Sequence, residues 1–573
     1  MRLGVVGFAV GCTGVLAGAL TWSIAACWAA PPVEGATLAS VAFVPIWTAL
    51  TLGLLARVRG RDAREGAARR RLVALHFELG GALALAAIVV FGSGVGALLD
   101  RSLGAWQTTQ PAREVPSWAE QPLDRVLASL VEDNPHLRRG ELSLRPARPE
   151  QPWIQADFRA AEGGWNRVDF DPDTGAAIAR DRPPLWVARE LHRRLLLPPW
   201  LGESLLGLLG LALALVLLSG LATRRRWLRS ALRKSKARAP LVMRLHQWIG
   251  VGMLTPALFW AWSGALLGLT MIVVPIVERA AYSGDRAGLM RDVLAVERPP
   301  VVDEVAALPD LRALAISGCP RVDEHLAGAT IDRVIVRHPG LASASVRVDV
   351  EGEGLRSRGS FTRTSTGALL DCRALAAAGP GLQTFTLAFV LHFGEWGPRA
   401  WVELASALLG LAMVALAWLG ALVLIRRRER SGALEAARRL RSGLLGVGLG
   451  LSLALTSSLL LSRLPSLARA EDLALALFVS TWALALVLAL GGELERRRAT
   501  LLQIQAVLVL ALPLVGWLVA DVRPGGFEAL CVLLGVLALR LAAQPTRPRE
   551  AAKEHPQAEP EHHDREERTD AAP

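Results

Sequence analysis

Four histidines recur at matched positions in two copies of an internal repeat. In "LHFELGG" and "LHQWIGV", His76 and His246 each stand four residues before a glycine, Gly80 or Gly250, and seventeen before a serine–glycine pair, with an offset of 170 residues throughout. Imidazole nitrogens bind transition metals, and two of them can hold one iron from its two axial sides. This spacing predicts metal chemistry that is shared between the two copies.

A second histidine pair follows the same logic with an offset of 200 residues. The segments "ELHRRLLLPPWLGESLLGLLGLALALVLLSG" and "VLHFGEWGPRAWVELASALLGLAMVALAWLG" align without a gap and match His192 to His392. The repeating unit, 70–226 and again 242–428, is expected to be an ascending helix, an outer segment and a descending helix. The two copies run in the same direction, so equivalent residues should lie at equal depth in the membrane.

Each of these residues also has a plain structural interpretation. A single histidine at a membrane interface is commonly a hydrogen-bonded or snorkelling side chain, but recurrence at four matched positions favours ligands. Gly80 and Gly250 lie one turn after their histidines on the same helix face, where they would leave room for a flat macrocycle. Small residues, among them Gly210 and Gly410, equally serve close helix packing. Both interpretations of the glycines stay open.

The composition is that of an integral membrane protein. Hydrophobic residues make up 52% of the 573 residues, the mean hydropathy is +0.35, and 18 tryptophans are present. Runs of about 20 apolar residues cross a bilayer as helices. We therefore expect a mainly α, polytopic fold with about ten transmembrane helices. The apolar runs fall at 3–30, 37–56, 72–99, 200–222, 247–276, 400–425, 443–462, 472–492, 500–520 and 525–542.

Basic residues set the expected orientation, because loops rich in Lys and Arg stay in the cytoplasm. The segments 57–71, 224–244 and 426–441 are arginine-rich, and every second loop is basic. The arginine-rich cytoplasmic loops account for most of the net charge of +12, so no nucleic-acid partner is expected. The long connections, about 100–199 and 279–385, then face the outside.

The regions that flank the repeat are expected to be simple. Residues 1–60 should form two N-terminal transmembrane helices, the first of them uncleaved although it resembles a signal peptide. Residues 442–543 should form four C-terminal transmembrane helices, for which scaffolding is the simplest role because they hold no histidine. The tail, 544–573, is polar and charged, which predicts a disordered cytoplasmic segment.

The outer segments are expected to be two small α+β domains. The stretch "PLDRVLASLVEDNP" has helical periodicity, and "WIQADFRAAEGGWNRVDFDPDTGAAI" alternates like strands joined by glycine turns. The second segment repeats the strand pattern, and the "TGA" that begins at Thr174 recurs at Thr366. Cys319 and Cys372 share this second segment and could pair. Neither segment holds a nucleophile beside a base, so no catalytic residue is assigned.

The repeat resembles the PepSY-associated transmembrane proteins, which include iron-regulated inner-membrane proteins and ferric-siderophore reductases. The resemblance rests on "ALHFELGG", "DPDTGAAI", "ELHRRL", "RLHQWIG" with "WSGALLGL", and "VLHFGEWG" leading to "IRRR", all within 70–428. It implies a bacterial inner-membrane protein with periplasmic PepSY-like domains. It also implies two haem b groups held by His76, His192, His246 and His392.

These observations together predict a di-haem electron conduit. Electrons would enter between His76 and His246, cross to His192 and His392, and reduce a periplasmic acceptor, most plausibly a ferric siderophore. The sequence holds no flavin or nicotinamide domain, so another cytoplasmic or membrane molecule must donate the electrons. Membrane lipid is the other expected partner. Two other classes stay open: an iron or siderophore permease or accessory subunit, and a non-redox PepSY binding module on a membrane anchor.

Overall fold

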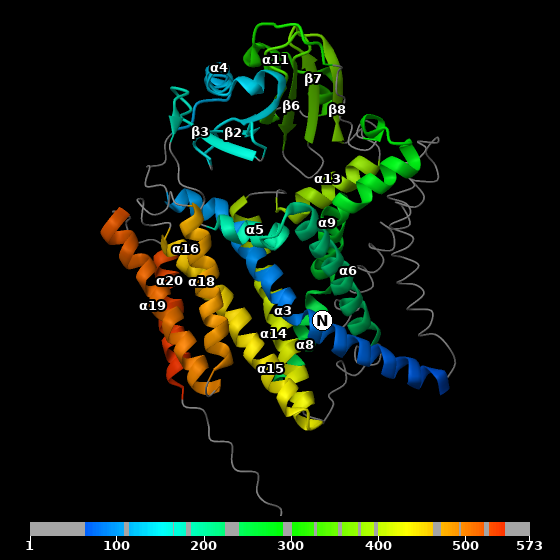
Figure 1. Ribbon diagram of the computed structural model, residues 1–573, viewed down its shortest axis with the longest axis vertical. Coiled ribbons are helices and arrows are strands. Elements are labelled where there is room, and N and C mark those ends of the chain that lie inside the picture. Colours follow the sequence, from blue (N-terminus) through cyan, green and yellow to red (C-terminus); the bar gives the residue numbers. More distant parts are fainter. Residues whose placement is uncertain are drawn as a thin grey trace, which may run out of the picture.

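A bundle of long helices carries a separate sheet domain at one end (Figure 1). Seven helices among the described residues are long and apolar enough to cross a membrane. These candidate spans are Arg70–Asp100, Pro199–Leu221, Leu254–Tyr282, Trp401–Arg430, Leu434–Leu461, Leu473–Leu490 and Arg496–Val515. The computed structural model describes residues 63–107, 114–149, 151–163, 165–178, 185–223, 240–289, 301–325, 329–352, 358–375, 380–394, 399–461, 471–491, 494–520 and 526–544.

The helices of the bundle alternate between long spans and short segments at its two ends. In chain order they are α3 (Ala63–Gln107), α5 (Trp186–Arg194), α6 (Pro199–Thr223), α8 (Leu241–Gly252), α9 (Leu254–Tyr282), α13 (Pro380–His392), α14 (Arg399–Arg430), α15 (Leu434–Leu444), the π-turn η3 (Leu445–Leu449), α16 (Gly450–Leu461), α18 (Glu471–Leu490), α19 (Leu494–Ala520) and α20 (Gly526–Ala543).

Seven of the ten predicted spans correspond to candidate spans of the structure. The predicted spans 3–30 and 37–56 lie outside the described residues, as does the tail, 545–573. The predicted span 525–542 is helical as α20, but it is not among the seven candidates. The described part of the chain is therefore a mainly helical membrane protein.

The predicted span 247–276 falls on two helices, since α8 ends at Gly252 and α9 begins at Leu254, with Met253 between them. Pro256 lies in the first turn of α9 and has no amide hydrogen to donate. In a continuous helix its ring would also clash with the carbonyl of Gly252. The interruption leaves His246 on α8, a short helix separate from the span that follows it.

Crosswise contacts join the two predicted copies: α6 packs against α9, and α14 packs against α3. Small residues allow the backbones to approach. A Cβ added to Gly207 of α6 would stand 2.8 Å from the amide nitrogen of Leu269, and a Cβ added to Gly268 would stand 2.7 Å from that of Gly207. Such close contacts drive helix association where lipid offers no hydrophobic force.

The C-terminal helices pack on one side of this core, along α3. The transition from α15 to α16 is the π-turn η3, where glycines leave room for large side chains of neighbouring helices. A Cβ on Gly448 would overlap the indole of Trp418, and one on Gly450 would stand 2.9 Å from the indole of Trp482. The apolar glycine run 446–450 is thus a helix-packing feature.

Strands from both outer segments form one antiparallel sheet in the order β4-β3-β2-β1-β5-β6-β7-β8. The sequence predicts two α+β units, and each segment does supply four neighbouring strands, but the structure joins them in a single sheet. The strands are β1 (Glu141–Arg145), β2 (Ile154–Arg159), β3 (Trp165–Phe170), β4 (Ala177–Ile178), β5 (Thr330–Arg337), β6 (Ser345–Glu351), β7 (Arg358–Thr364) and β8 (Leu369–Ala374).

The two half-sheets meet where β1 pairs with β5. Ser143 stands opposite Ile335, with Leu142 opposite Val336 and Leu144 opposite Val334. An alignment of the two copies through their "TGA" turns makes the Ser143–Ile335 pair the centre of a twofold arrangement. Pairing covers one edge of each half-sheet, and exposed edges invite wrong association. This is the physical reason for one sheet where the sequence suggested two.

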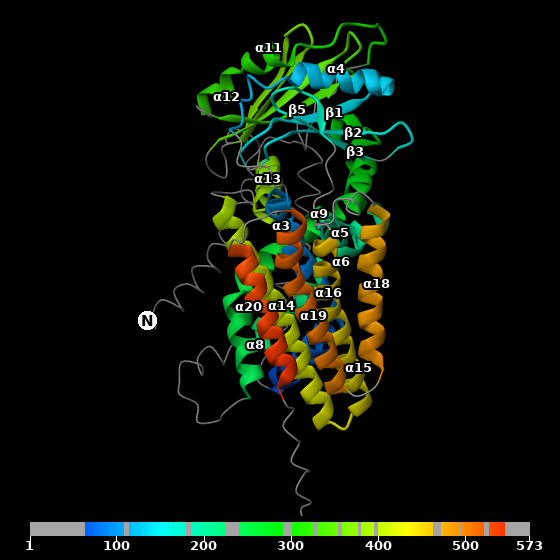
Figure 2. The same ribbon diagram turned by 90° about the vertical axis from the view of Figure 1, so that its left-hand side faces the viewer.

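Three helices cover the sheet face that points away from the bundle, namely α4 (Leu123–Asp133), α11 (Leu311–Ile316) and α12 (Pro320–His325) (Figures 1 and 2). The apolar side chains of the strands point into this helix-covered face. Across the two copies, Asp124 Oδ1 accepts the amide hydrogen of Leu311 at 2.6 Å, and desolvation raises the pKa of Asp124. The opposite sheet face is polar and looks toward α5 and α13.

A disulfide between Cys319 and Cys372 ties the start of α12 to β8, and so the pairing proposed from the sequence is confirmed. It closes a loop with a sequence separation of 53 residues. Replacing both cysteines by serine should lower the free energy of unfolding of the sheet domain by about 2–4 kcal/mol, because the unfolded chain gains freedom. Thermal unfolding of the full chain, with and without reductant, measures this. A reductant that lowers the melting temperature of the serine variant as much as that of the native chain would contradict the assignment.

Candidate functional site

The structure places the four repeat histidines in two facing pairs. His76 of α3 faces His246 of α8, with ring centroids 6.3 Å apart and ring planes at 55°. His192 of α5 faces His392 of α13, with centroids 6.2 Å apart and planes at 30°. Each pair takes one histidine from each predicted copy. We call them the far-side pair (His76, His246) and the sheet-side pair (His192, His392).

The separation within each pair matches one metal ion held between two imidazoles. A ring nitrogen binds such a metal at about 2.0 Å, and the ring centroid lies roughly 1.1 Å behind that nitrogen, so two opposed ligands have centroids about 6.2 Å apart. The observed 6.3 and 6.2 Å agree with this value.

Backbone carbonyls set the tautomer of three of the rings. The Nδ1 atom of His192 lies 2.9 Å from the carbonyl oxygen of Val90, and that of His76 lies 3.0 Å from the carbonyl oxygen of Val216. A carbonyl oxygen only accepts, so Nδ1 carries the proton and Nε2 carries the lone pair. The Nδ1 atom of His246 makes the equivalent contact, 3.2 Å from the carbonyl oxygen of residue 416. Metal-binding histidines are oriented in this way.

In the fourth ring, that of His392, the Nδ1 atom contacts a serine hydroxyl in place of a backbone carbonyl. Ser263 Oγ donates to the carbonyl of Phe259 at 2.9 Å and accepts from Nδ1 of His392 at 2.8 Å. Ser93, at the matching position of the first copy, donates to the carbonyls of Val89 at 2.7 Å and Val90 at 3.2 Å, and the carbonyl of Val90 is the one that His192 contacts. The two rings of the sheet-side pair are therefore held by different acceptors.

Four glycines allow the rings to approach the helices that hold them. A Cβ on Gly220 would stand 2.9 Å from His76, and a Cβ on Gly420 would stand 3.1 Å from His246. On the sheet side, Gly94 and Gly264 take this place, with distances of 2.9 Å to His192 and 3.7 Å to His392. The sequence signal for these positions was present, since all four recur at the repeat offsets beside serine or leucine.

Gly80 and Gly250, which the sequence suggested as space for a macrocycle, contact side chains other than the histidine rings. A Cβ on Gly80 would stand 3.5 Å from the side chain of Val216, and one on Gly250 would stand 3.4 Å from that of Leu416, which are near-ordinary contacts. Their predicted role in making room for a macrocycle stays a prediction. Gly210 meets the backbone of α9, with 2.7 Å to the carbonyl oxygen of Ala261, so its role is helix packing.

Burial keeps the sheet-side histidines neutral. Desolvation lowers the pKa of His192, and desolvation together with the neighbouring His192 lowers the pKa of His392 to about 3. Both residues lie outside the seven candidate spans. A neutral imidazole is the form that binds a metal, so both rings are ready for ligation across the physiological pH range.

An apolar region separates the two pairs. It contains Met253, Met413 and Leu416, and the rings of Phe91 and Trp260 lie 6.3 Å apart within it. On α3, the distance along the axis from His76 to the level of Gly94 is roughly 27 Å at 1.5 Å per residue. This is close to the thickness of a hydrocarbon core, about 30 Å. The two pairs thus lie at different levels along α3.

Among the described residues, no cluster of three or more His, Cys, Asp or Glu side chains is arranged to hold a metal ion. Protein sites for a bare zinc or iron ion generally use three or four such ligands. Each histidine pair supplies two. A metal held here therefore needs further donors from a non-protein group.

These features define a polytopic membrane protein whose helices present opposed histidine pairs at both ends of the bundle. Residues 73–427 match the family described as PepSY-associated TM region, which covers more than half of the chain. The protein belongs to this PepSY-associated transmembrane family. Comparison with curated proteins finds no match.

Gly94 and Gly264 leave different amounts of space beside His192 and His392, so a substitution at each should have a different effect on stability. Gly94→Ala should displace the ring of His192 and cost about 1–3 kcal/mol, as overpacked sites do. Gly264→Ala, at the matching position, meets His392 only at an ordinary distance and should be neutral or slightly stabilising, since alanine favours helix. Thermal unfolding of the two purified variants compares them. If both variants lost the same free energy of unfolding, contact between the added Cβ and the histidine ring would not be the cause of the loss.

Proposed function

We propose that the protein is a di-haem b electron carrier that passes electrons across the membrane to an acceptor beside the sheet domain. The observation that carries this proposal is the pair of opposed imidazoles at each end of the bundle, with centroids 6.3 and 6.2 Å apart. A haem would bring most of the donors to its own iron and would need only two imidazoles from the protein, which His76 with His246 and His192 with His392 would supply. This is the donor set that each histidine pair offers.

The geometry on the chain's side fits this cofactor. The Nδ1–H groups are engaged with carbonyls or Ser263, which leaves the lone pair on Nε2, the atom that would bind the iron. Glycines beside all four rings let the imidazoles lie close to the neighbouring helix. Haem iron, when bound, supplies a one-electron couple whose potential depends on ligands and burial. The helices then hold each centre in position and exclude water from the region between the centres.

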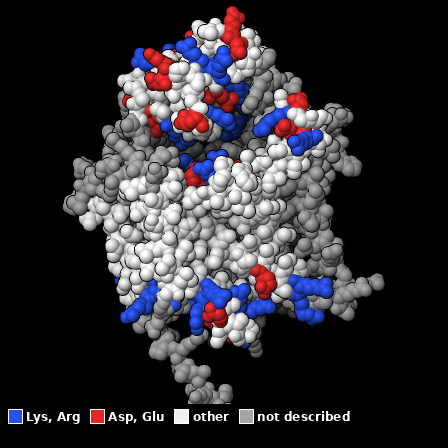
Figure 3. Space-filling view, in the orientation of Figure 1, with Lys and Arg blue, Asp and Glu red and all other residues white. Residues whose placement is uncertain are grey.

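The direction of transfer follows from the proposed topology. We place the protein in a bacterial inner membrane with ten spans, a tandem parallel repeat and PepSY-like units in the periplasm. Arginines gather at the end of the bundle opposite the sheet domain (Figure 3), as expected for the cytoplasmic side. The Cys319–Cys372 disulfide supports an oxidising compartment for the sheet domain.

Reduction of a ferric siderophore is the activity we infer from this placement. Electrons reach the sheet-side pair from the far-side pair, where a cytoplasmic or membrane donor delivers them. The chelated Fe(III) accepts one electron and becomes Fe(II). Fe(II) is held far less tightly by hard oxygen donors, so the iron is released on the outer side.

Replacing one histidine from each pair tests the cofactor assignment. His76→Ala and His392→Ala should each lower the haem content from two per chain to one, because each removes an axial ligand of a different centre. Haem quantification and reduced-minus-oxidised spectra of the purified variants measure this. His136→Ala, on the exposed 3-10 helix of the sheet domain, should keep both haems. Two haems in either site variant would overturn the pairing.

His192 and His392 contact different acceptors, and this difference predicts which serine affects the midpoint potential of a haem. Ser263→Ala removes the acceptor of the His392 Nδ1–H, so the ring becomes a less basic ligand and the midpoint potential of one centre should rise. Ser93→Ala removes only a long second hydrogen bond to the carbonyl of Val90 and keeps the His192 bond to it, so it should move the midpoint potential much less. Spectroelectrochemical titration of both variants measures these midpoint potentials. The same shift in both, or none in either, would exclude the serine from this role.

A further inference from the structure

The helix that carries His192 lies between two parts of the bundle. On one side is α3, and on another are the C-terminal helices α16 and α18 (Figures 1 and 2). Ala188 and His192 are four residues apart, so they lie on one face of α5. This face meets α3, since a Cβ added to Gly96 would stand 2.8 Å from Ala188 and one added to Gly94 would stand 2.9 Å from the ring of His192.

A second face of α5 packs against the C-terminal helices. It forms an apolar cluster whose buried members are Val187 and Leu191 of α5, Leu451 and Ala454 of α16, and Phe478 of α18. We call this group the α5 cluster. Phe478 is its largest side chain and is fully buried. The many contacts of such a side chain stabilise the position of α5 against α16 and α18.

The start of α5 is held by α3 through a carboxylate. Asp100 is buried, and its Oδ1 accepts the amide hydrogen of Leu185, the residue before α5, at 2.9 Å. Its Oδ2 lies 3.4 Å from Nη1 of Arg189, which is in the first turn of α5. A negative charge at this end of a helix also interacts favourably with the helix dipole. Polar contacts therefore fix the start of α5, and apolar contacts fix the turns that follow.

The turn after α5 depends on its surroundings. Leu195 and Leu196 have φ of 56° and 59°, a left-handed conformation that residues with a Cβ rarely adopt. Such residues persist where packing holds them, and both leucines pack against the α5 cluster. In the turn after α13, the left-handed residue is Gly394, for which this conformation costs little. The two ligand helices of the sheet-side pair thus end in different ways.

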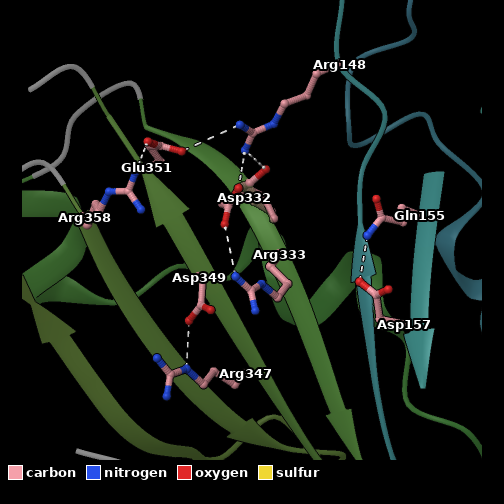
Figure 4. Close-up of polar contacts among 10 residues, drawn as sticks. Arg148, Gln155, Asp157, Asp332, Arg333, Arg347, Asp349, Glu351 and Arg358 are labelled. Carbon is pink, nitrogen blue, oxygen red and sulfur yellow. Dashed lines mark hydrogen bonds and ion pairs between the residues drawn. The ribbon is translucent and has the colours of Figure 1, made fainter. Parts of the chain in front are cut away.

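Contacts within the bundle, and not those of the sheet domain, account for the placement of α5. The ion pairs in Figure 4, such as that of Arg347 with Asp349 at 2.8 Å, join residues of the sheet domain to one another. The other ligand helix, α13, packs against α9. Within the described part of the chain, neither apolar cluster that joins α5 to the C-terminal helices contains a residue of α13.

We propose that Phe478 is a positioning residue for His192, and that the C-terminal helices hold this ring in place as an axial ligand through the α5 cluster. Phe478 shares that cluster with Leu191, the residue before His192. Without its ring, a cavity would open beside α5 and the turn at Leu195 would lose its support. The inference deepens the proposed function and rests on it for the bound haem.

Hydrogen exchange of α5 tests the positioning without any cofactor. In the purified full chain, Phe478→Ala should speed exchange of the backbone amides of residues 187–196 by roughly tenfold, because the cavity favours local opening. Leu501→Ala is the matched control, since Leu501 is equally buried but lies in a separate apolar cluster that contains no residue of α5. It should leave this exchange unchanged. Leu475→Ala, which alters a partly buried neighbour of the α5 cluster, should give a smaller increase.

Carbon monoxide binding tests whether the helix positions a ligand. In the His76→Ala chain the sheet-side haem is the one expected to remain, and its reduced form should not bind carbon monoxide while both imidazoles are bound. Adding Phe478→Ala should make it bind, because His192 leaves the iron in part of the molecules. Adding Leu501→Ala should not. Phe478→Leu, which keeps most of the volume, should restore the behaviour of the parent chain.

Three results would overturn the positioning role. They are unchanged exchange of α5 in both Phe478→Ala and Leu475→Ala, an equal increase in Leu501→Ala, and faster exchange of α5 without carbon monoxide binding. If the native chain carries both haems and one of these results is found, the positioning role is wrong while the electron carrier stands. If the native chain binds no haem, the electron carrier is wrong, and exchange of α5 alone decides whether Phe478 positions this helix.

Discussion

The site depends on the hydrogen bond that each imidazole Nδ1–H makes within an apolar bundle. In a medium of low dielectric constant such a bond is strong, and a buried donor without an acceptor is costly. The bond therefore fixes both the tautomer and the orientation of the ring. It also explains the adjacent glycines: the carbonyl of Val216 is reached by His76 only because Gly220 has no side chain in the way.

Helix packing and the sheet both hold the two predicted copies together. Each pair needs one histidine from each copy, and the crosswise contacts of α6 with α9 and of α14 with α3 bring the copies together. At the level of the sheet, β1 pairs with β5 about Ser143 and Ile335. The disulfide then fastens the last strand of this sheet to α12.

The two predicted copies depart from symmetry in three places. The C-terminal helices pack along α3 on one side of the bundle. The ring of His392 reaches Ser263, whereas His192 reaches a carbonyl directly. On the sheet, Arg337 pairs with Glu141, whereas the residues that the "TGA" alignment makes their counterparts, Arg145 and Arg333, are both arginines. The first difference comes from additional helices, whereas the other two lie in side chains on a shared backbone arrangement.

By itself the sequence determined the membrane class, the apolar spans and the four histidines, because hydropathy and repeat spacing are local or periodic properties. It also indicated the strands, since alternation and the "TGA" turn are visible in one dimension. Only the tertiary structure decided that the half-sheets share one seam, that α8 and α9 separate at Met253, and that Gly94, Gly220, Gly264 and Gly420 face the rings. These features depend on which surfaces meet, and contact between distant segments leaves no periodic signal in a single chain.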